Sequence, residues 1–250
     1  MLEVRNLTKH FGGLAALNAA SIDVAEGEIV ALIGPNGAGK TTLFAAISGF
    51  VRPDAGSVRF GGADITCLAP HLICARGLAR TFQIVQPFEK LTVRENIAVG
   101  AHLHRPARRG ALAYAEAVAR RVGLEGRLDQ PAASLTVAAR KRLELAKTLA
   151  TDPKLLLLDE VMAGLNPTEV DEVVAIIRSI RESGVTVLLT EHVMQAVVSL
   201  AERIYVLAGG RVIAQGSTAS VTSDPAVIEA YLGRGAAARL HNRQEAPHAS

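Results

Sequence analysis

The sequence predicts an α/β protein in which a mainly parallel sheet is covered by helices and interrupted by a helical subdomain. Short apolar runs of strand length alternate with stretches of helical periodicity. One such run ends in a glycine-rich loop that leads directly into a helix. The composition, 49% hydrophobic with 4% aromatic residues and no tryptophan, implies an aliphatic core of the kind that fills a buried parallel sheet.

The first part of the chain predicts strands, a loop and a helix. Apolar residues have strand spacing at Leu2, Val4, Leu7, Ile22 and Val24. Residues 28–33 form an apolar run that ends at the glycine-rich loop, and residues 41–48 after it have helical spacing. Residues 56–60, followed by two glycines, predict an outer hairpin and hence an antiparallel β subdomain.

Helical patterns dominate from residue 84 to residue 139, and we predict a helical subdomain there, inserted between core segments 1–83 and 140–235. The predicted helices in and after this insert cover residues 111–122 and 138–150. The α/β alternation then resumes, with strands at 154–158, 185–189, 203–207 and 211–214 and helices at 168–183, 193–201 and 225–232. The polar, alanine-rich stretch 236–250 predicts a disordered tail.

The glycine-rich loop carries the most specific chemical signal. It consists of Gly34, Pro35, Asn36, Gly37, Ala38, Gly39, Lys40, Thr41 and Thr42. The pattern G-x-x-x-x-G-K-[ST] lets backbone N–H groups turn toward phosphate oxygens, and the start of the following helix adds partial positive charge. Lys40 would reach the β- and γ-phosphates, and the Thr41 hydroxyl would coordinate Mg²⁺. The sequence therefore predicts ATP and Mg²⁺ as cofactors.

Polar side chains follow two further predicted strands. Asp159 and Glu160 come after four leucines, where Asp159 would hold Mg²⁺ and Glu160 would act as the base that activates water. Taken alone, a strand that simply ends in acids explains this pair equally well, and the upstream phosphate loop favours the functional interpretation. His192 follows the next strand, on the edge where the phosphates are expected.

Charge and cysteine content limit the other possible roles. The net charge of +3 is mild, and no run of Lys and Arg is interleaved with aromatics, so we expect no nucleic-acid partner. Arg105, Arg108 and Arg109 predict a solvated face, with a membrane surface as the alternative. Cys67 and Cys74 predict reduced structural thiols. The N-terminus does not look like a signal peptide and the apolar runs are strand-sized, so we expect contact with a membrane only through a partner.

In this order the motifs resemble the nucleotide-binding subunit of an ABC transporter, over residues 2–233. The resemblance implies a P-loop NTPase (RecA-like) core. It implies that Phe11 stacks on adenine, that Gln83 senses the γ-phosphate and Mg²⁺ and touches the membrane subunit, and that His192 is the switch histidine. It also implies catalytic roles for Glu160, His192 and Gln83, metal contacts from Thr41, Gln83 and Asp159, and a meeting with a second ATPase at residues 163–166.

Within that family the chain resembles the ATPases of branched-chain amino acid importers, on the phrases at 11–14, 79–83, 163–167 and 227–233. Urea and amide importers use similar subunits. This resemblance implies transmembrane permease subunits, a second ATPase subunit with a heterodimer favoured, and indirectly a periplasmic solute-binding protein. It implies a peripheral location on the cytoplasmic face of a bacterial inner membrane.

One segment departs from the family pattern. The signature Leu-Ser-Gly-Gly-Gln, which caps the ATP bound to the partner, is replaced by Leu135, Thr136, Val137, Ala138 and Ala139. Thr136 keeps a hydroxyl, but Val137 and Ala138 add Cβ atoms where the backbone must approach a phosphate closely. This predicts a weaker cap, or a surface that faces a slowly hydrolysing site.

Three other functions stay open at this point. An ATPase of the same fold could serve export of lipid or lipopolysaccharide, which the identity of the membrane partner would distinguish. A non-transport ABC protein acting on ribosomes or DNA usually has two ATPase halves or a long coiled-coil insert. A subunit that only binds ATP would suit the altered signature, but Glu160 and His192 argue against it.

Overall fold

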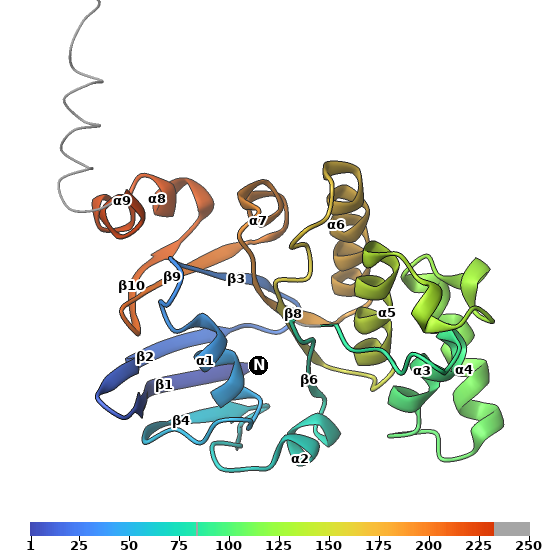
Figure 1. Ribbon diagram of the computed structural model, residues 1–250. Helices are drawn as coiled ribbons and strands as arrows, with labels where there is room; N and C mark the ends of the chain where they lie inside the picture. Colours follow the sequence, from blue (N-terminus) through green and yellow to red (C-terminus); the bar gives the residue numbers. More distant parts are fainter. Residues whose placement is uncertain (84, 233–250) are drawn as a thin grey trace, which may run out of the picture.

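The computed structural model describes residues 1–83 and 85–232, and it contains two sheets with helices on either side (Figure 1). The predicted tail at 236–250 lies outside the described residues. Among those described, no helix is both long enough and apolar enough to span a membrane.

The smaller sheet is antiparallel, with strand order β2-β1-β4-β5. Its strands are β1 (Leu2–Phe11), β2 (Leu14–Val24), β4 (Ala55–Phe60) and β5 (Ala63–Asp64). Strands β4 and β5 pair across the two glycines that predicted an outer hairpin, which confirms it. Strands β1 and β2 turn at Gly12 and Gly13, which leaves Phe11 at the tip of the hairpin.

The larger sheet has the order β10-β9-β3-β8-β7-β6, and its pairs are parallel except for β9 with β10. Its strands are β3 (Ile29–Ile33), β6 (Leu78–Arg80), β7 (Leu155–Asp159), β8 (Thr186–Thr190), β9 (Arg203–Ala208) and β10 (Arg211–Gly216). Strand β6 was not predicted, because three residues are too few for a periodic pattern. It is the edge strand of the sheet and pairs with β7, the strand that is followed by Glu160 and ends at Asp159.

Alternate residues of the parallel strands enter two different cores. Val30 and Leu32 of β3 face the core shared with the antiparallel sheet and α1 (Lys40–Ile47), whereas Ala31 and Ile33 face the helices on the other side. Since side chains alternate across a strand, a sheet buried on both faces needs continuous apolar runs, and these are what the sequence supplies.

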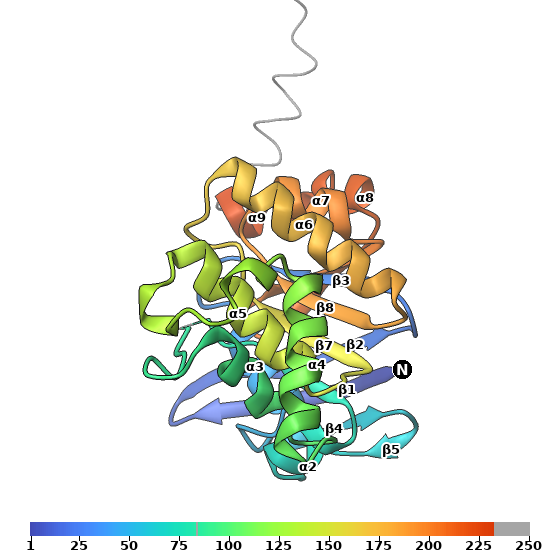
Figure 2. The same cartoon turned by 90° about the vertical axis from the view of Figure 1, so that its right-hand side faces the viewer.

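Three helices pack together in and directly after the predicted helical insert (Figure 2). They are α3 (Val93–Ala101), α4 (Arg108–Arg121) and α5 (Val137–Leu149). Buried alanines let them approach closely, and a Cβ atom added at Gly100 of α3 would lie 2.2 Å from the carbonyl oxygen of Lys147 on α5. Helix α5 crosses the predicted boundary at residues 139 and 140, so one rigid helix joins the insert to the core.

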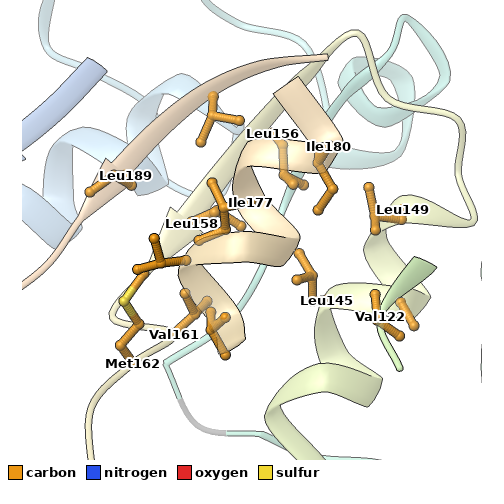
Figure 3. Close-up of a cluster of buried hydrophobic side chains, with 14 of the residues drawn as sticks. Val122, Leu145, Leu149, Leu156, Leu158, Val161, Met162, Ile177, Ile180 and Leu189 are labelled. Carbon is orange, nitrogen blue, oxygen red and sulfur yellow. The ribbon is translucent and has the colours of Figure 1, made fainter. Parts of the chain in front are cut away.

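Helix α6 (Pro167–Glu182) covers the outer face of the parallel sheet. It begins with a capping box between Asn166 and Glu169, and its buried residues are Val170, Val173, Val174, Ile177 and Ile180, which are the face predicted from the sequence. Figure 3 shows Ile177 and Ile180 beside Leu156 and Leu158 of β7. The remaining helices are α2 (Pro70–Ala75), α7 (Met194–Leu200), α8 (Thr218–Thr222) and α9 (Pro225–Leu232).

Candidate active site

The glycine-rich loop lies between the end of β3 and the start of α1, and neighbouring backbone fixes its path. Gly34 has φ of 153°, and a Cβ atom there would lie 2.0 Å from the carbonyl oxygen of Leu207. Gly39 has φ of 105°, and a Cβ there would lie 2.3 Å from the carbonyl oxygen of Ala16. Side chains are therefore excluded at both positions by sterics as well as by conformation.

Lys40 opens α1 with its side chain folded over this loop. Its Nζ donates hydrogen bonds to the carbonyl oxygens of Gly34 at 2.7 Å and Pro35 at 3.2 Å, and the residue is buried. Burial lowers the pKa of Lys40, while the negative charges of Glu160 and Asp159 act in the opposite direction. Among the described residues, no side chain caps the start of α1, so its first N–H groups are available to bind an anion.

Asp159 ends β7 with both carboxylate oxygens engaged. Thr190 of β8 donates to Oδ1 at 2.9 Å, and Arg80 of β6 donates to Oδ2 at 2.7 Å. The backbone N–H of Asp159 donates to the hydroxyl of Thr81 at 3.1 Å. The carboxylate is thus buried and held in one orientation by the strands on both sides.

Glu160 contacts two other predicted site residues, Gln83 and His192. Its Oε2 accepts from Nε2 of Gln83 at 2.6 Å, and its Oε1 lies 3.0 Å from Nε2 of His192. The backbone of Glu160 is left-handed, with φ of 51°, and its N–H donates to the carbonyl oxygen of Thr190. A non-glycine residue in this conformation indicates a position that the surroundings enforce, and such positions cluster at functional sites.

The carboxyl group of Glu191 is buried near Glu160. Oε1 of Glu191 accepts from the backbone N–H of Met162 at 2.8 Å, and only 2% of the residue is exposed. Burial raises the pKa of Glu191 to about 7, against the opposing effects of the Met162 hydrogen bond and the positive charge of Lys141. Lys141 of α5 in turn donates to the carbonyl oxygen of Glu160 at 3.1 Å, which links the helical layer to the site.

The other predicted site residues lie on β1, on α1 and at the start of α5. Phe11 ends β1 with half of its surface exposed, and Nζ of Lys9 lies 5.5 Å from its ring centroid. Thr41 is exposed on the first turn of α1. The signature segment forms the start of α5, where Thr136 is the N-cap and its hydroxyl accepts from the N–H of Ala139 at 3.3 Å.

The residues that replace the family signature differ in how far they are exposed. Val137 exposes 63% of its surface, whereas Ala138 and Ala139 are buried against the helical layer. Of the two residues that stand in place of glycines, only Val137 presents its side chain to the outside. Figure 1 shows α5 in the helical layer, separated from α1 by β6.

Sequence reasoning missed Arg80, Lys141, Thr190 and Glu191. Thr190 and Glu191 directly precede His192 at the end of β8, so the rule that drew attention to His192 could have found them. Arg80 and Lys141 carried no such signal. They lie on β6 and α5, and the sequence pattern does not show that these two elements are close to the site.

A phosphate-binding loop at the carboxyl end of a parallel sheet, beside a buried aspartate and a glutamate held between Gln and His, defines a P-loop ATPase. The family model described as "ABC transporter" matches residues 17–163, and the one described as "Branched-chain amino acid ATP-binding cassette transporter" matches residues 211–237. The chain belongs to the ABC transporter family and is one of its ATPases.

Relatives match over nearly the whole chain. The high-affinity branched-chain amino acid transport ATP-binding protein BraF of Pseudomonas aeruginosa is 40% identical, over 93% of this chain and 98% of its own. The corresponding LivG of Escherichia coli K12 is 37% identical with the same coverage, and the probable LivG of Archaeoglobus fulgidus is 38% identical over 93% and 95%. A solved nucleotide-free ATP-binding cassette from an ABC transporter is 32% identical, with a TM-score of 0.85 over 94% of this chain and 99% of that one. A solved cassette in its ADP conformation has a TM-score of 0.84.

Proposed function

We propose that this chain hydrolyses ATP, with Glu160 as the general base, to power import of branched-chain amino acids or a related small polar solute such as urea or amides. The observation that carries the chemistry is the Glu160 carboxylate, held by Gln83 at 2.6 Å and by His192 at 3.0 Å. The names of the relatives support the solute class and do not favour lipid export or a non-transport role.

The proposed roles follow from chemistry and position. Lys40 and the N–H groups at the start of α1 bind the β- and γ-phosphates, and Phe11 offers an aromatic face for adenine. Glu160 accepts a proton from the attacking water, while His192 and Gln83 hold the Glu160 carboxylate in place.

The residues at this edge also fit Mg²⁺. The Thr41 hydroxyl, the Gln83 amide and the Asp159 carboxylate offer oxygen donors, which are the ligands that this cation prefers. When bound there, Mg²⁺ would neutralise developing charge on the phosphates. Asp159 is suited to this role because Thr190 donates to Oδ1 and orients the carboxylate.

A groove beside β6 is the proposed docking site for a transmembrane permease. It encloses about 590 Å³, and among its walls are the exposed rings of Phe50, Phe82 and Phe88 and the side chain of Val99. We refer to it as the docking groove. Apolar side chains gathered in this way suit an inserted helix or loop. Docking there would bring the chain to the cytoplasmic face of a bacterial inner membrane.

A second ATPase subunit completes the proposed assembly. The signature segment 135–139 would cap ATP on that subunit, whose own signature would cap the nucleotide on this chain. The altered segment favours a heterodimer, in which the partner supplies the better cap. We assign the core to residues 1–83 and 140–235 and the moving helical subdomain to 84–139, with a solute-binding protein acting indirectly outside the membrane.

Glu160→Gln tests the assignment of the base. In the complex assembled with its permeases, we expect ATP turnover to fall by about 100-fold or more, because general-base catalysis contributes on that order. Binding of ATP should be retained, since the amide keeps the shape of the carboxylate. Glu182→Gln, on the exposed end of α6, is the matched control. Unchanged turnover by Glu160→Gln would show that another group is the base.

A further inference from the structure

Arg80 lies between the docking groove and the aspartate of the active site. It is the last residue of β6, it lines the groove, and only 8% of its side chain is exposed. One of its terminal nitrogens donates to Oδ2 of Asp159 at 2.7 Å. A single side chain therefore touches both the surface proposed for the permease and the carboxylate proposed for Mg²⁺.

Two aromatic rings lie near the guanidinium of Arg80, Phe82 in the groove and Phe44 in the buried core. Its central carbon lies 5.7 Å from the ring centroid of Phe82 and 5.9 Å from that of Phe44. Phe82 meets Phe50 edge to face, with centroids 5.4 Å apart. Phe50 and Phe82 are exposed in the groove, so a segment that packs on this aromatic pair would press on the group that holds Arg80.

The Nε atom of Arg80 is buried and, among the described residues, has no hydrogen-bond acceptor. A buried donor without a partner is unfavourable, and native structures seldom leave one unexplained. Because Nε is buried, an acidic side chain on the docked segment would pair with this donor and with the positive charge only after the guanidinium has turned into the groove. The groove chemistry thus points to an apolar segment with one strong acceptor.

We propose that Arg80 is a positioning residue through which permease docking acts on Asp159. In the isolated chain, Arg80 occupies Oδ2 of Asp159 and competes with the hydrated Mg²⁺ for that oxygen. An acidic side chain of the permease attracts the positively charged guanidinium into the groove, where Nε becomes accessible to it, and draws the guanidinium from Asp159, which favours metal binding. By linkage, Mg-nucleotide bound at Asp159 favours docking at the groove to the same extent.

This inference rests on the proposed function, but its first test uses the isolated chain. Binding of a fluorescent ATP analogue is titrated with Mg²⁺ for the wild type, for Arg80→Met and for Arg76→Met, a nearby exposed arginine outside the groove. We expect the half-saturating Mg²⁺ concentration to fall at least threefold for Arg80→Met alone. An unchanged value for Arg80→Met, or the same change in both variants, would overturn the competition at Asp159.

The second test uses the complex with its permeases. Arg80→Lys keeps a positive charge near Asp159, so it should fold even if Arg80→Met does not, but it removes Nε and the planar group. We expect Arg80→Lys to co-purify with the permeases while the stimulation of ATP turnover by them falls at least fivefold, and Arg76→Lys to behave as wild type. Full stimulation of Arg80→Lys would overturn the coupling.

Failure of the proposed function gives a different result. If the wild-type chain did not co-purify with the permeases, the docking groove would be misassigned and the coupling to the groove would be overturned with it. The Mg²⁺ titration of the isolated chain would still decide whether Arg80 competes for Asp159.

Discussion

The site around Glu160 and the signature segment at 135–139 are built in opposite ways. Around Glu160, side chains from several strand ends contact one another through hydrogen bonds of 2.6 to 3.2 Å. The signature segment is the start of one helix, with one capping hydrogen bond and one exposed valine. Under the proposed function, the first region would be a highly connected half of one ATP site and the second a sparsely connected half of another.

The physical reason for the contrast is topology. The carboxyl ends of β3, β8, β7 and β6 are neighbours in the sheet, so residues that follow these strands meet at one edge. A helix start in a separate layer has no such neighbours and offers only backbone N–H groups and its cap. Changes at the first region should therefore affect binding and stability strongly, and changes at the second should act mildly and on the partner's site.

The largest expected effect is at Lys40. Lys40→Ala removes charge-assisted hydrogen bonds to phosphate, each worth about 1.5–3 kcal/mol, so we expect ATP affinity to fall roughly 100-fold. Calorimetric titration of the isolated chain measures this, with Lys154→Ala at an exposed lysine as the control. An affinity within a factor of three of wild type would remove Lys40 from the phosphate site and weaken the contrast.

The next effect concerns Glu191 and pH. The unfolded carboxyl loses its proton near pH 4.5, whereas burial keeps it on the folded chain until about pH 7. The folded state of the wild type therefore loses stability as pH rises through this window, by about 3 kcal/mol in total. Glu191→Gln has no carboxyl that titrates at this position, so its folding stability should not fall in this way as pH rises.

Urea unfolding of wild type and Glu191→Gln at pH 5 and pH 8 measures this difference. Glu182→Gln, an exposed site, should follow the wild type at both values. Parallel pH profiles for wild type and Glu191→Gln would mean that Glu191 titrates normally and that this side of the molecule is less tightly enclosed than its contacts indicate.

A smaller effect is expected at the helix cap. Thr136→Ala removes the hydrogen bond to Ala139 and should cost about 1 kcal/mol of unfolding free energy, while Thr136→Ser should restore it. Nucleotide affinity of the isolated chain should not change, since the proposed function assigns this segment to the partner's ATP site. Loss of that affinity in Thr136→Ala would contradict the separation of the two regions.

The smallest effect is expected at Val137. Val137→Gly removes the exposed apolar side chain of the signature segment, and we expect turnover by the assembled ATPase pair to rise about twofold to threefold, which is less than 1 kcal/mol in barrier height. Val137→Ala should give a smaller rise. Unchanged or reduced turnover in both variants would show that the valine is not what limits the cap.

Patterns within short segments of the sequence predicted much of the fold and about half of the residues that form the candidate site. The loop at 34–42, the apolar face of α6 and the polar residues after β7 and β8 were recognised because each is encoded within one short segment. The short strand β6 was missed, and with it Arg80, because a three-residue strand has no measurable period.

By itself, the sequence determined which residue types stand at the strand ends and which positions must be glycine, since these depend on backbone conformation and on a few adjacent residues. Only the tertiary structure decided that Arg80 pairs with Asp159, 79 residues away, and that Lys141 reaches Glu160. It also decided that Glu191 is buried. The strand order β3-β8-β7-β6 differs from the chain order, so the long-range contacts of these charges follow from the packing of the whole sheet and not from any local pattern.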